Sequence, residues 1–221
     1  MTNDYVKQIY GGRSVSNYPE QLAKYLAREY WKTGTLLDVG CGDKVFMDEF
    51  AKLGFECTGI DYPEVNFEKD KLPYKAASFD FIFCKSVIEH LANTNHFLKE
   101  IHRVLRPNGV AIILTPAWEY NFTDFYNDYT HIHPFEKKGL NDALVINQFK
   151  IKYIEYFYQL PFIWKRPWLT FVAKTIDILF GDSWKWKDKD QTQHRKLIRF
   201  SKEVMLLAVV IKTNPEDEYA R

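Results

Sequence analysis

The fold of this 221-residue chain is decided by residues 36–42, Leu36-Leu37-Asp38-Val39-Gly40-Cys41-Gly42. An apolar run stops at the Gly-Cys-Gly turn, and a helical pattern resumes from Val45 to Leu53 and ends before Gly54. Glycine allows the backbone to turn tightly and to approach a ligand without interference from a Cβ atom. The stretch therefore predicts a buried strand, a glycine turn and a helix.

Further strands and helices alternate around this unit. The other predicted elements are, in chain order, a helix over 18–32, strands over 55–60, 78–85 and 110–115 with a helix through 96–105 between the last two, and late strands over 149–158 and 204–212. This alternation predicts an α/β fold with a mainly parallel sheet and helices on both faces, because parallel neighbours need crossover connections. Ligands on such sheets bind beyond the carboxyl ends of the strands.

Composition limits the class of function. Lys and Arg total 30 against 29 for Asp and Glu, so the chain lacks the positive field that attracts nucleic acid, and a small or neutral substrate is expected. The cysteines Cys41, Cys57 and Cys84 show no metal-ligand spacing, which predicts free thiols and no metal site. Because we find neither a secretory signal pattern nor an apolar run long enough to span a membrane, we expect a cytoplasmic protein.

An acidic side chain follows the glycine turn by about 20 residues, the distance typical of nucleoside-binding α/β folds. Asp61 ends the next predicted strand, where its two carboxylate oxygens can accept hydrogen bonds from the vicinal hydroxyls of a ribose. A structural turn followed by a surface aspartate is the alternative interpretation.

Three motifs follow one another between Leu36 and Pro116. They are LLDVGCGDKVFMDEFAKLGFECTGIDY, LPYKAASFDFIFCKSVIEHL and FLKEIHRVLRPNGVAIILTP. In order and spacing they resemble the class I S-adenosylmethionine-dependent methyltransferases that act on small molecules. The resemblance implies a Rossmann-like, seven-stranded, mostly parallel sheet, with S-adenosyl-L-methionine as cofactor.

The resemblance also implies a set of cofactor-binding residues. By position these are Asp38, Gly40, Cys41, Gly42, Asp61, Tyr62, Leu72, Lys85 and Ser86. In the family the glycine loop supports the methionine part of the cofactor, the acid matching Asp38 orients its amino group and the acid matching Asp61 binds the ribose. The segment matching Leu72 flanks the adenine, and the strand end matching Lys85 and Ser86 lies near the sulfonium.

Two features depart from the family pattern. Lys44 stands where a third glycine is usual, and only ten residues separate Asp61 from Leu72, too few for the helix and strand expected there. We therefore expect one edge of the sheet to be shortened to an extended stretch over 62–70.

Two rival functions remain open. A nicotinamide-dependent oxidoreductase shares the sheet and the ribose acid, but its pyrophosphate needs a close helix terminus, and Asp43 after the turn repels phosphate. A catalytically silent binding or scaffold protein is the other alternative, motivated by Lys44 and the missing helix.

The catalytic candidates follow two predicted strands, His90 the strand over 78–85 and Asp128 and His131 the strand over 110–115. His131 is a candidate base for removing a hydroxyl proton, with Asp128 as its orienting partner, and His90 is a second candidate base. The alternative is that the loop residues only hold the loop to the body. For Glu89 and His90 we favour a local role in helix capping and lid packing over a catalytic one.

The string Thr130-His131-Ile132-His133-Pro134-Phe135 resembles a Thr-His-x-x-Pro-Phe pattern of methyltransferases in polysaccharide and glycolipid assembly. This match predicts a glycan-linked or other small-molecule acceptor and methylation on oxygen. Aromatic and cationic residues alternate in 162–172 and 184–187, which suits either a helix docked on the core or peripheral contact with a membrane.

The length suits a single domain. We assign 1–33 to an N-terminal lid and helix, with Tyr10-Gly11-Gly12-Arg13 as the lid, and 34–116 to a cofactor-binding core. Residues 117–148 form a substrate loop and helix, and 149–221 hold the late strands with an aromatic-rich insertion at 160–193. The oligomeric state is not written in the sequence.

Overall fold

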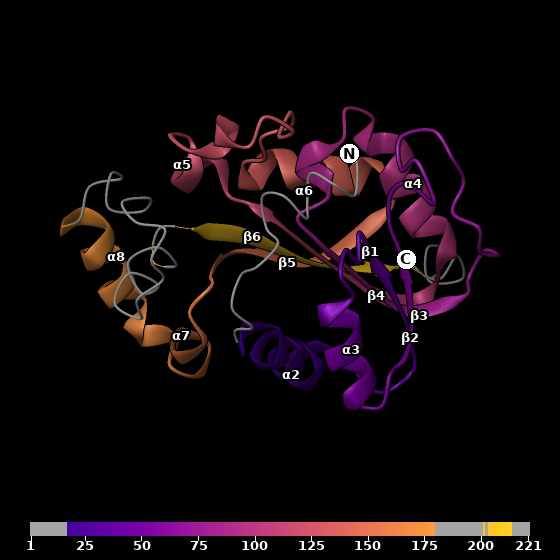
Figure 1. Cartoon of the computed structure of the whole chain (residues 1–221), viewed down its shortest axis with the longest axis horizontal. Coiled ribbons are helices and arrows are strands. Elements are labelled where there is room, and N and C mark those ends of the chain that lie inside the picture. The colour runs from indigo at the N-terminus through magenta and orange to yellow at the C-terminus, as the bar shows by residue number, and fades with distance from the viewer. Residues whose placement is uncertain (1–16, 180–200, 202, 214–221) are drawn as a thin grey trace, which may run out of the picture.

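One six-stranded sheet organises the structure, a computed structural model that describes residues 17–179, 201 and 203–213. The strands are, in chain order, β1 (Thr35–Val39), β2 (Glu56–Ile60), β3 (Phe79–Lys85), β4 (Leu105–Pro116), β5 (Phe149–Tyr158) and β6 (Val204–Lys212). Within the sheet they lie in the order β2-β1-β3-β4-β6-β5 (Figure 1).

Helices cover both faces of this sheet. The α-helices of the described residues are α2 (Tyr18–Tyr30), α3 (Val45–Lys52), α4 (Thr94–Val104), α5 (Trp118–Asn121), α6 (Lys137–Ile146), α7 (Pro161–Lys165) and α8 (Thr170–Leu179), and the 3-10 helices are η1 (Ile88–His90), η2 (Phe125–Asn127) and η3 (Pro167–Leu169). Figure 1 shows α2 and α3 against one face and α4, α5 and α6 on the other. The Rossmann-like α/β class is therefore confirmed. Within the described residues, no helix combines the length and apolarity needed to cross a bilayer.

Each face of the sheet has its own apolar core. On the α2–α3 side, the rings of Phe50 and Phe83 lie 5.2 Å apart between centroids and both side chains are buried. On the other side, Leu98 and Ile101 of α4 and Leu140 of α6 are fully buried. Each such side chain contributes about 1.5–3 kcal/mol through removal of its apolar surface from water, so both layers are anchored to the sheet.

The register of the parallel strands brings their carboxyl ends to one edge. Val39 at the end of β1 pairs with Ile60 of β2 and with Cys84 of β3. The loops after these three strands consequently emerge side by side, as ligand-binding loops do in open parallel sheets. β6 runs antiparallel between β4 and β5.

The sheet has six strands within the described residues, so the expectation of seven is not matched. The expected shortening at one edge is confirmed, since the edge strand β2 leads directly into a segment that connects to β3. This segment is wound into turns rather than extended: the Asp70 carboxylate accepts from the Asn66 N–H at 2.9 Å, and the Asn66 side chain accepts from the Glu68 N–H at 3.0 Å. Local side-chain bonds of this kind favour turns over strands.

The insertion after β5 begins with α7, η3 and α8. The Trp164 indole donates a hydrogen bond to the Tyr158 carbonyl at 2.7 Å and stacks on Phe157, which fixes α7 to the core. Trp168 and Phe171 are more than half exposed. The first part of the aromatic segment is thus docked at α7 and solvent-facing beyond it. The lid residues 10–13 and the aromatic pair in 184–187 lie outside the described residues.

Candidate functional site

The glycine loop after β1 requires glycine for two different reasons. Gly40 has φ +78°, and a Cβ atom there would lie 2.2 Å from Cγ2 of Val87, so the loop packs directly on the connection after β3. Gly42 has φ +50°, and a Cβ atom added to it would meet no heavy atom within 4 Å. The backbone at Gly42 therefore faces open space, where a ligand can approach it.

Asp61 is bound to this loop by its carboxylate. One oxygen accepts from the Gly42 N–H at 2.9 Å and the other from the Tyr62 N–H at 2.8 Å. Partial burial raises the pKa of Asp61, and these two bonds oppose the rise. The side chain is consequently held at the rim of the glycine loop.

Asp38 lies deeper, at 2% exposure, and its Oδ2 is buried with no hydrogen-bond partner among the described residues. Burial raises the pKa of Asp38 to about 7, and the negative charge of Asp61 adds to the rise. An unsatisfied buried carboxylate oxygen is costly, and a cationic group placed against it would remove that cost.

The remaining residues implied in cofactor binding occupy three neighbouring loops. Tyr62 is 39% exposed, Leu72 is buried, and Cys41 is a half-buried free thiol whose pKa burial raises to about 11. Ser86 adopts φ 57° directly after β3, and Lys85 Nζ lies 5.8 Å from the centroid of the Phe46 ring. All of them follow the carboxyl ends of β1, β2 or β3 or the turns beyond.

The segment that contains Leu72 is held by α4. The Glu100 carboxylate accepts from the Leu72 N–H at 2.8 Å, and Arg103 donates to the carbonyls of Leu72 and Tyr74 at 2.9 and 2.8 Å. Glu100 and Arg103 also pair with each other at 2.7 Å. Helix α4 thus supports a segment that lacks regular structure of its own.

A second group of polar side chains centres on η1. Glu89 is fully buried; its Oε2 accepts from the Thr115 hydroxyl at 2.9 Å, whereas its Oε1 is buried with no hydrogen-bond partner among the described residues. Burial raises the pKa of Glu89 to about 7. The expectation that Glu89 and His90 cap the next helix is wrong, because Asn93 is the N-cap of α4 and its side chain accepts from the His96 N–H.

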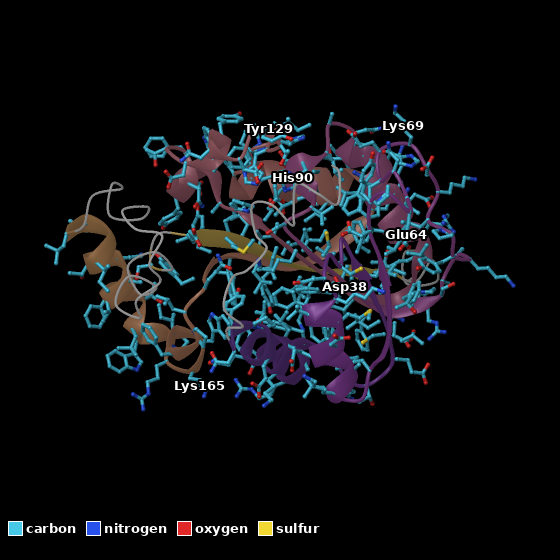
Figure 2. All side chains as sticks on the ribbon, viewed as in Figure 1. Asp38, Glu64, Lys69, His90, Tyr129 and Lys165 are labelled. Atoms are coloured by element: carbon cyan, nitrogen blue, oxygen red, sulfur yellow. The ribbon has the colours of Figure 1, made fainter. Side chains whose placement is uncertain are left out.

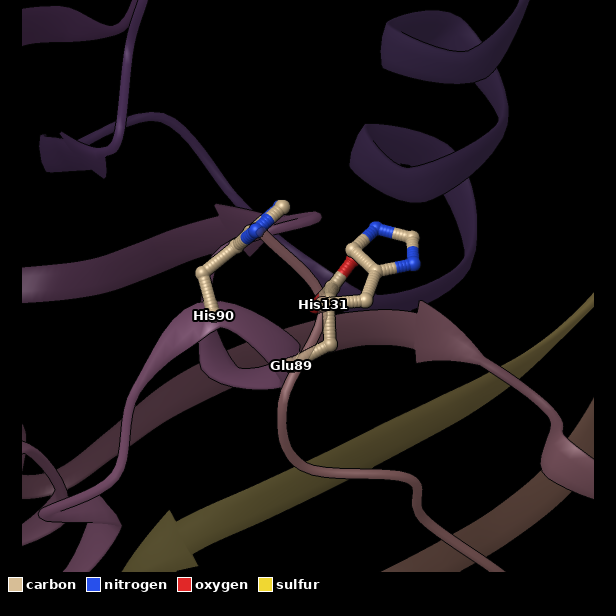
Figure 3. Close-up of side chains that lie close together, drawn as sticks. All are labelled: Glu89, His90 and His131. Atoms are coloured by element: carbon tan, nitrogen blue, oxygen red, sulfur yellow. The ribbon is translucent and has the colours of Figure 1, made fainter. Parts of the chain in front are cut away.

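The structure brings His131 next to this group. The N–H groups of Ile132 and His133 donate to the Glu89 carbonyl at 3.0 and 2.9 Å, which attaches the loop after β4 to η1. The His90 and His131 rings lie 4.6 Å apart between centroids. Figure 3 shows the side chains of Glu89, His90 and His131 pointing toward one another.

The geometry of Asp128 differs from the expected pairing with His131. Its Oδ2 lies 4.0 Å from His131 Nε2, beyond hydrogen-bond distance, while its Oδ1 accepts from the Thr130 N–H and hydroxyl. The group that orients His131 is the Phe125 carbonyl, 2.8 Å from Nδ1.

His90 is oriented in the same way by a backbone carbonyl. Its Nδ1 lies 3.2 Å from the Thr130 carbonyl and 3.0 Å from the Thr130 hydroxyl. Burial lowers the pKa of His90 to about 4, with a further contribution from His131, so the ring is neutral at neutral pH. Both histidines named as candidate bases are therefore in one cluster.

Sequence reasoning missed Glu89 and Thr115 as members of this cluster. The signal for Glu89 was a carboxylate inside the otherwise apolar string Val87-Ile88-Glu89-His90-Leu91, which predicts a buried charge. Thr115 carried no such signal, because a threonine at the end of a buried strand is common.

Exposed apolar side chains surround the loop that carries His131. Phe122, Tyr126, Tyr129 and Ile132 are each at least 50% exposed. In Figure 2, Tyr129 lies at the surface and His90 further inside, both on the side of the sheet covered by α5 and α6. An apolar rim therefore lies beside the buried polar cluster.

Comparison with known proteins places the chain in a family. A family model described as a methyltransferase domain matches residues 14–153. Two ubiquinone biosynthesis O-methyltransferases are similar: that of Caulobacter vibrioides is 30% identical over 109 residues, which is 40% of this chain and 43% of the relative. That of Pelagibacter ubique is 33% identical over 98 residues, 36% of this chain and 41% of the relative. The match thus spans less than half the length of these relatives.

Solved structures share the fold at low sequence identity. An S-adenosylmethionine-dependent methyltransferase from Mesorhizobium loti has a TM-score of 0.61 at 16% identity, covering 87% of this chain and 97% of the other. A protein of Pyrococcus horikoshii has a TM-score of 0.63 at 16% identity, covering 96% and 100%. These likenesses concern the fold alone.

Proposed function

This chain belongs to the family of class I S-adenosylmethionine-dependent methyltransferases, and from that premise we propose that it methylates a hydroxyl oxygen of a small-molecule acceptor bound beside Glu89, His90 and His131. The observation that carries the proposal is the pair of acids, Asp38 and Asp61, on either side of the glycine loop. Asp38 has a buried oxygen without a hydrogen-bond partner among the described residues, and Asp61 is held against the Gly42 N–H.

These residues fit the cofactor chemically. S-adenosylmethionine carries an ammonium group, a ribose and a sulfonium but no phosphate, and the loop presents the acids Asp38, Asp43 and Asp61 to it. Asp38 would accept a hydrogen bond from the ammonium group and Asp61 from the ribose hydroxyls. Gly40, Cys41 and Gly42 would allow the methionine part to approach the backbone.

Three further contacts complete this proposal. Leu72, buried beneath the α4 side, would flank the adenine, and Tyr62 follows the ribose acid. Lys85 ends β3 and Ser86 follows it, and both would lie near the sulfonium.

The chain's own residues would align the reactants and manage one proton. When bound, the cofactor supplies a methyl group on a positively charged sulfur, so the carbon needs no further activation. His131 Nε2 would take the proton of the acceptor hydroxyl, and the hydroxyl oxygen would accept the methyl group while the electron pair of the broken carbon–sulfur bond stays on sulfur. Asp128 supports this role by its charge at 4.0 Å rather than by a hydrogen bond.

Two features support a partly apolar acceptor. The rim of Phe122, Tyr126 and Tyr129 is exposed beside the cluster, and the similar curated proteins are named O-methyltransferases. Within the proposal a ring or sugar bearing a hydroxyl would lie on the aromatic rim. A glycan-linked acceptor is the second candidate, supported by the Thr130 to Phe135 string alone.

Each part of the chain would have its own role in the proposed reaction. Residues 34–116 would hold the cofactor, 117–148 would hold the acceptor, and 149–221 would complete the sheet around the insertion at 160–193.

Calorimetry with S-adenosylhomocysteine tests the cofactor site. Replacing Asp61 by Ala should weaken binding by about 2 kcal/mol, roughly 30-fold, because the ribose loses a charged acceptor. Asp48→Ala is the matched control, since Asp48 is exposed on α3. Equal affinities for the Asp61 variant and the wild type would refute the site.

Measuring the turnover of a His131 variant tests the proposed role of this residue at the acceptor. His131→Gln should lower kcat by roughly 10²- to 10⁴-fold while the affinity for S-adenosylhomocysteine stays within a few-fold. A candidate acceptor can be found by incubating hydroxylated aromatic and glycan pools with the cofactor and following the mass gain of a methyl group. Full turnover in His131→Gln would remove this residue from the mechanism.

A further inference from the structure

The cluster around η1 has the composition of a metal site. One ligand-type atom each from Glu89, His90 and His131 lie within 4.8 Å of one another. Two imidazoles and a carboxylate are a donor set that binds Zn²⁺ and Fe²⁺ in proteins and leaves further coordination positions open. The residues come from η1 and from the loop after β4, so no local spacing in the sequence revealed them.

Each side chain is anchored by one polar atom and leaves the other available. His131 and His90 direct Nδ1 at the carbonyls of Phe125 and Thr130, at 2.8 and 3.2 Å. An Nδ1–H that donates to a carbonyl fixes the tautomer in which Nε2 carries the lone pair, and metal-ligating histidines are usually oriented in this way. His90 Nε2 makes no hydrogen bond to another described residue, and the contact of His131 Nε2 with Asp128 is 4.0 Å long.

Glu89 supplies the independent observation. Its side chain is fully buried, Thr115 binds Oε2, and Oε1 has no hydrogen-bond partner among the described residues. A buried carboxylate oxygen without a donor costs free energy that a bound cation would recover. Figure 3 shows this carboxyl group directed toward the two imidazoles.

We propose that Glu89, His90 and His131 bind one divalent transition-metal ion, with zinc as the first candidate, and that this ion holds the acceptor oxygen. Around bonds of about 2.0–2.1 Å, the ligand atoms, which lie up to 4.8 Å apart without the ion, would approach to about 3.3 Å from one another. The ion lowers the pKa of a bound hydroxyl, which then loses its proton to water near neutral pH. This role rests on the proposed methyl transfer, and in it the imidazoles act as ligands instead of bases.

Metal binding can be measured without cofactor or acceptor. Tag-free protein, stripped with a chelator and dialysed, is titrated with zinc chloride by calorimetry and with cobalt chloride by visible absorption. We expect one equivalent of Zn²⁺ and the d–d bands of a Co²⁺ site with nitrogen and oxygen ligands. Glu89→Gln, His90→Ala and His131→Ala should each weaken zinc binding at least 10-fold.

His133→Ala is the matched control. His133 lies two residues from His131, but its ring stacks on Phe135 at 4.4 Å and is not part of the cluster. This variant should keep the wild-type zinc affinity within about 3-fold. No zinc binding by the wild type, or a zinc affinity equal to that of the wild type in all four variants, would overturn the proposal.

S-adenosylhomocysteine binding in the same samples separates the two proposals. A protein that binds S-adenosylhomocysteine but does not bind zinc would reject the metal site and leave the methyltransferase assignment intact. Zinc binding that is lost in the three cluster variants, in a protein with no affinity for S-adenosylhomocysteine, would support the metal site and reject the cofactor site.

Discussion

In the proposed cofactor site, Asp38 would link cofactor binding to the release of a proton. Its pKa is raised to about 7 by burial and by the charge of Asp61, and a cationic amino group placed beside it would lower that pKa. Binding of S-adenosylhomocysteine should therefore release a proton below pH 7, and affinity should increase as the pH rises from 6 to 7. Calorimetry in buffers of different ionisation enthalpy measures the released proton.

The Asp38→Asn variant checks this linkage. It should bind S-adenosylhomocysteine roughly 10- to 100-fold more weakly, and its binding enthalpy should not depend on the buffer. A buffer-dependent enthalpy of the same size in the variant would show that the proton comes from another group.

At the scale of single residues, the sequence predicts the relative position of side chains where that position follows from local order. Asp38 lies one residue before the end of β1 and Asp61 directly follows β2, and parallel strands bring their carboxyl ends together. The relation between Asp128 and His131 failed because three residues of loop can adopt many conformations, and Asp128 bonds to Thr130 instead. Glu89 and His131 meet only through contacts between distant segments, which no short pattern contains.

Among the elements, α3 begins at a strained residue. Lys44, its N-cap, adopts φ 65°, a left-handed conformation that costs a residue with a side chain about 1–2 kcal/mol. Glycine removes this cost but adds freedom to the unfolded chain, so Lys44→Gly should raise the free energy of unfolding by roughly 0.5 kcal/mol. Denaturant unfolding measures it.

Lys44→Ala serves as the control for the lost charge. Alanine has a Cβ atom and therefore pays the same free-energy cost for the left-handed backbone conformation, so this variant should be no more stable than the wild type. Equal stabilisation by Ala and Gly would indicate that the charge of Lys44, and not its backbone, destabilises the loop.

The contact between α4 and the segment after β2 leads to another prediction. Glu100 and Arg103 are 10% and 29% exposed and bind the backbone around Leu72. Glu100→Gln should destabilise the protein by about 1–3 kcal/mol, because it leaves buried donors poorly paired. It should also lower the affinity for S-adenosylhomocysteine several-fold. Urea unfolding and calorimetry test the two effects.

An exposed ion pair provides the comparison. Lys138 and Asp142 on α6 are 84% and 49% exposed, so Asp142→Asn should change neither stability nor binding measurably. If Glu100→Gln behaves like this control, α4 does not support the segment. The sequence predicted that a helix and strand were missing here but not the side chains of α4 that compensate, because those lie about 30 residues further along the chain.

For the molecule as a whole, buried acids set the response to pH. Burial raises the pKa of Asp38 and of Glu89 to about 7, so the stability that their protonated forms contribute is complete below about pH 4 and is lost as the pH rises to 7. Burial lowers the pKa of His90 to about 4, which acts in the opposite sense between pH 4 and 6.5. The combined effect of the two carboxyl groups on the free energy of unfolding is larger than the opposite effect of the one imidazole.

The ligand-free protein should therefore have a larger free energy of unfolding at pH 5 than at pH 8. Denaturant titrations across this range measure the trend. The double variant Asp38→Asn, Glu89→Gln should flatten it, with most of its gain in stability at pH 8. A wild-type stability that increases from pH 5 to pH 8 would contradict this account of the buried acids.

The position of β6 in the sheet has a consequence for the protein during its synthesis. β6 comes last among the described strands in the chain, yet it pairs with both β4 and β5. While the ribosome is still adding residues 159–203, both partners present unpaired edges that invite association with other nascent chains. The interval between the synthesis of β5 and that of β6 is therefore the one in which these edges are open to association, and a message that stops before codon 204 leaves β4 and β5 without their common partner.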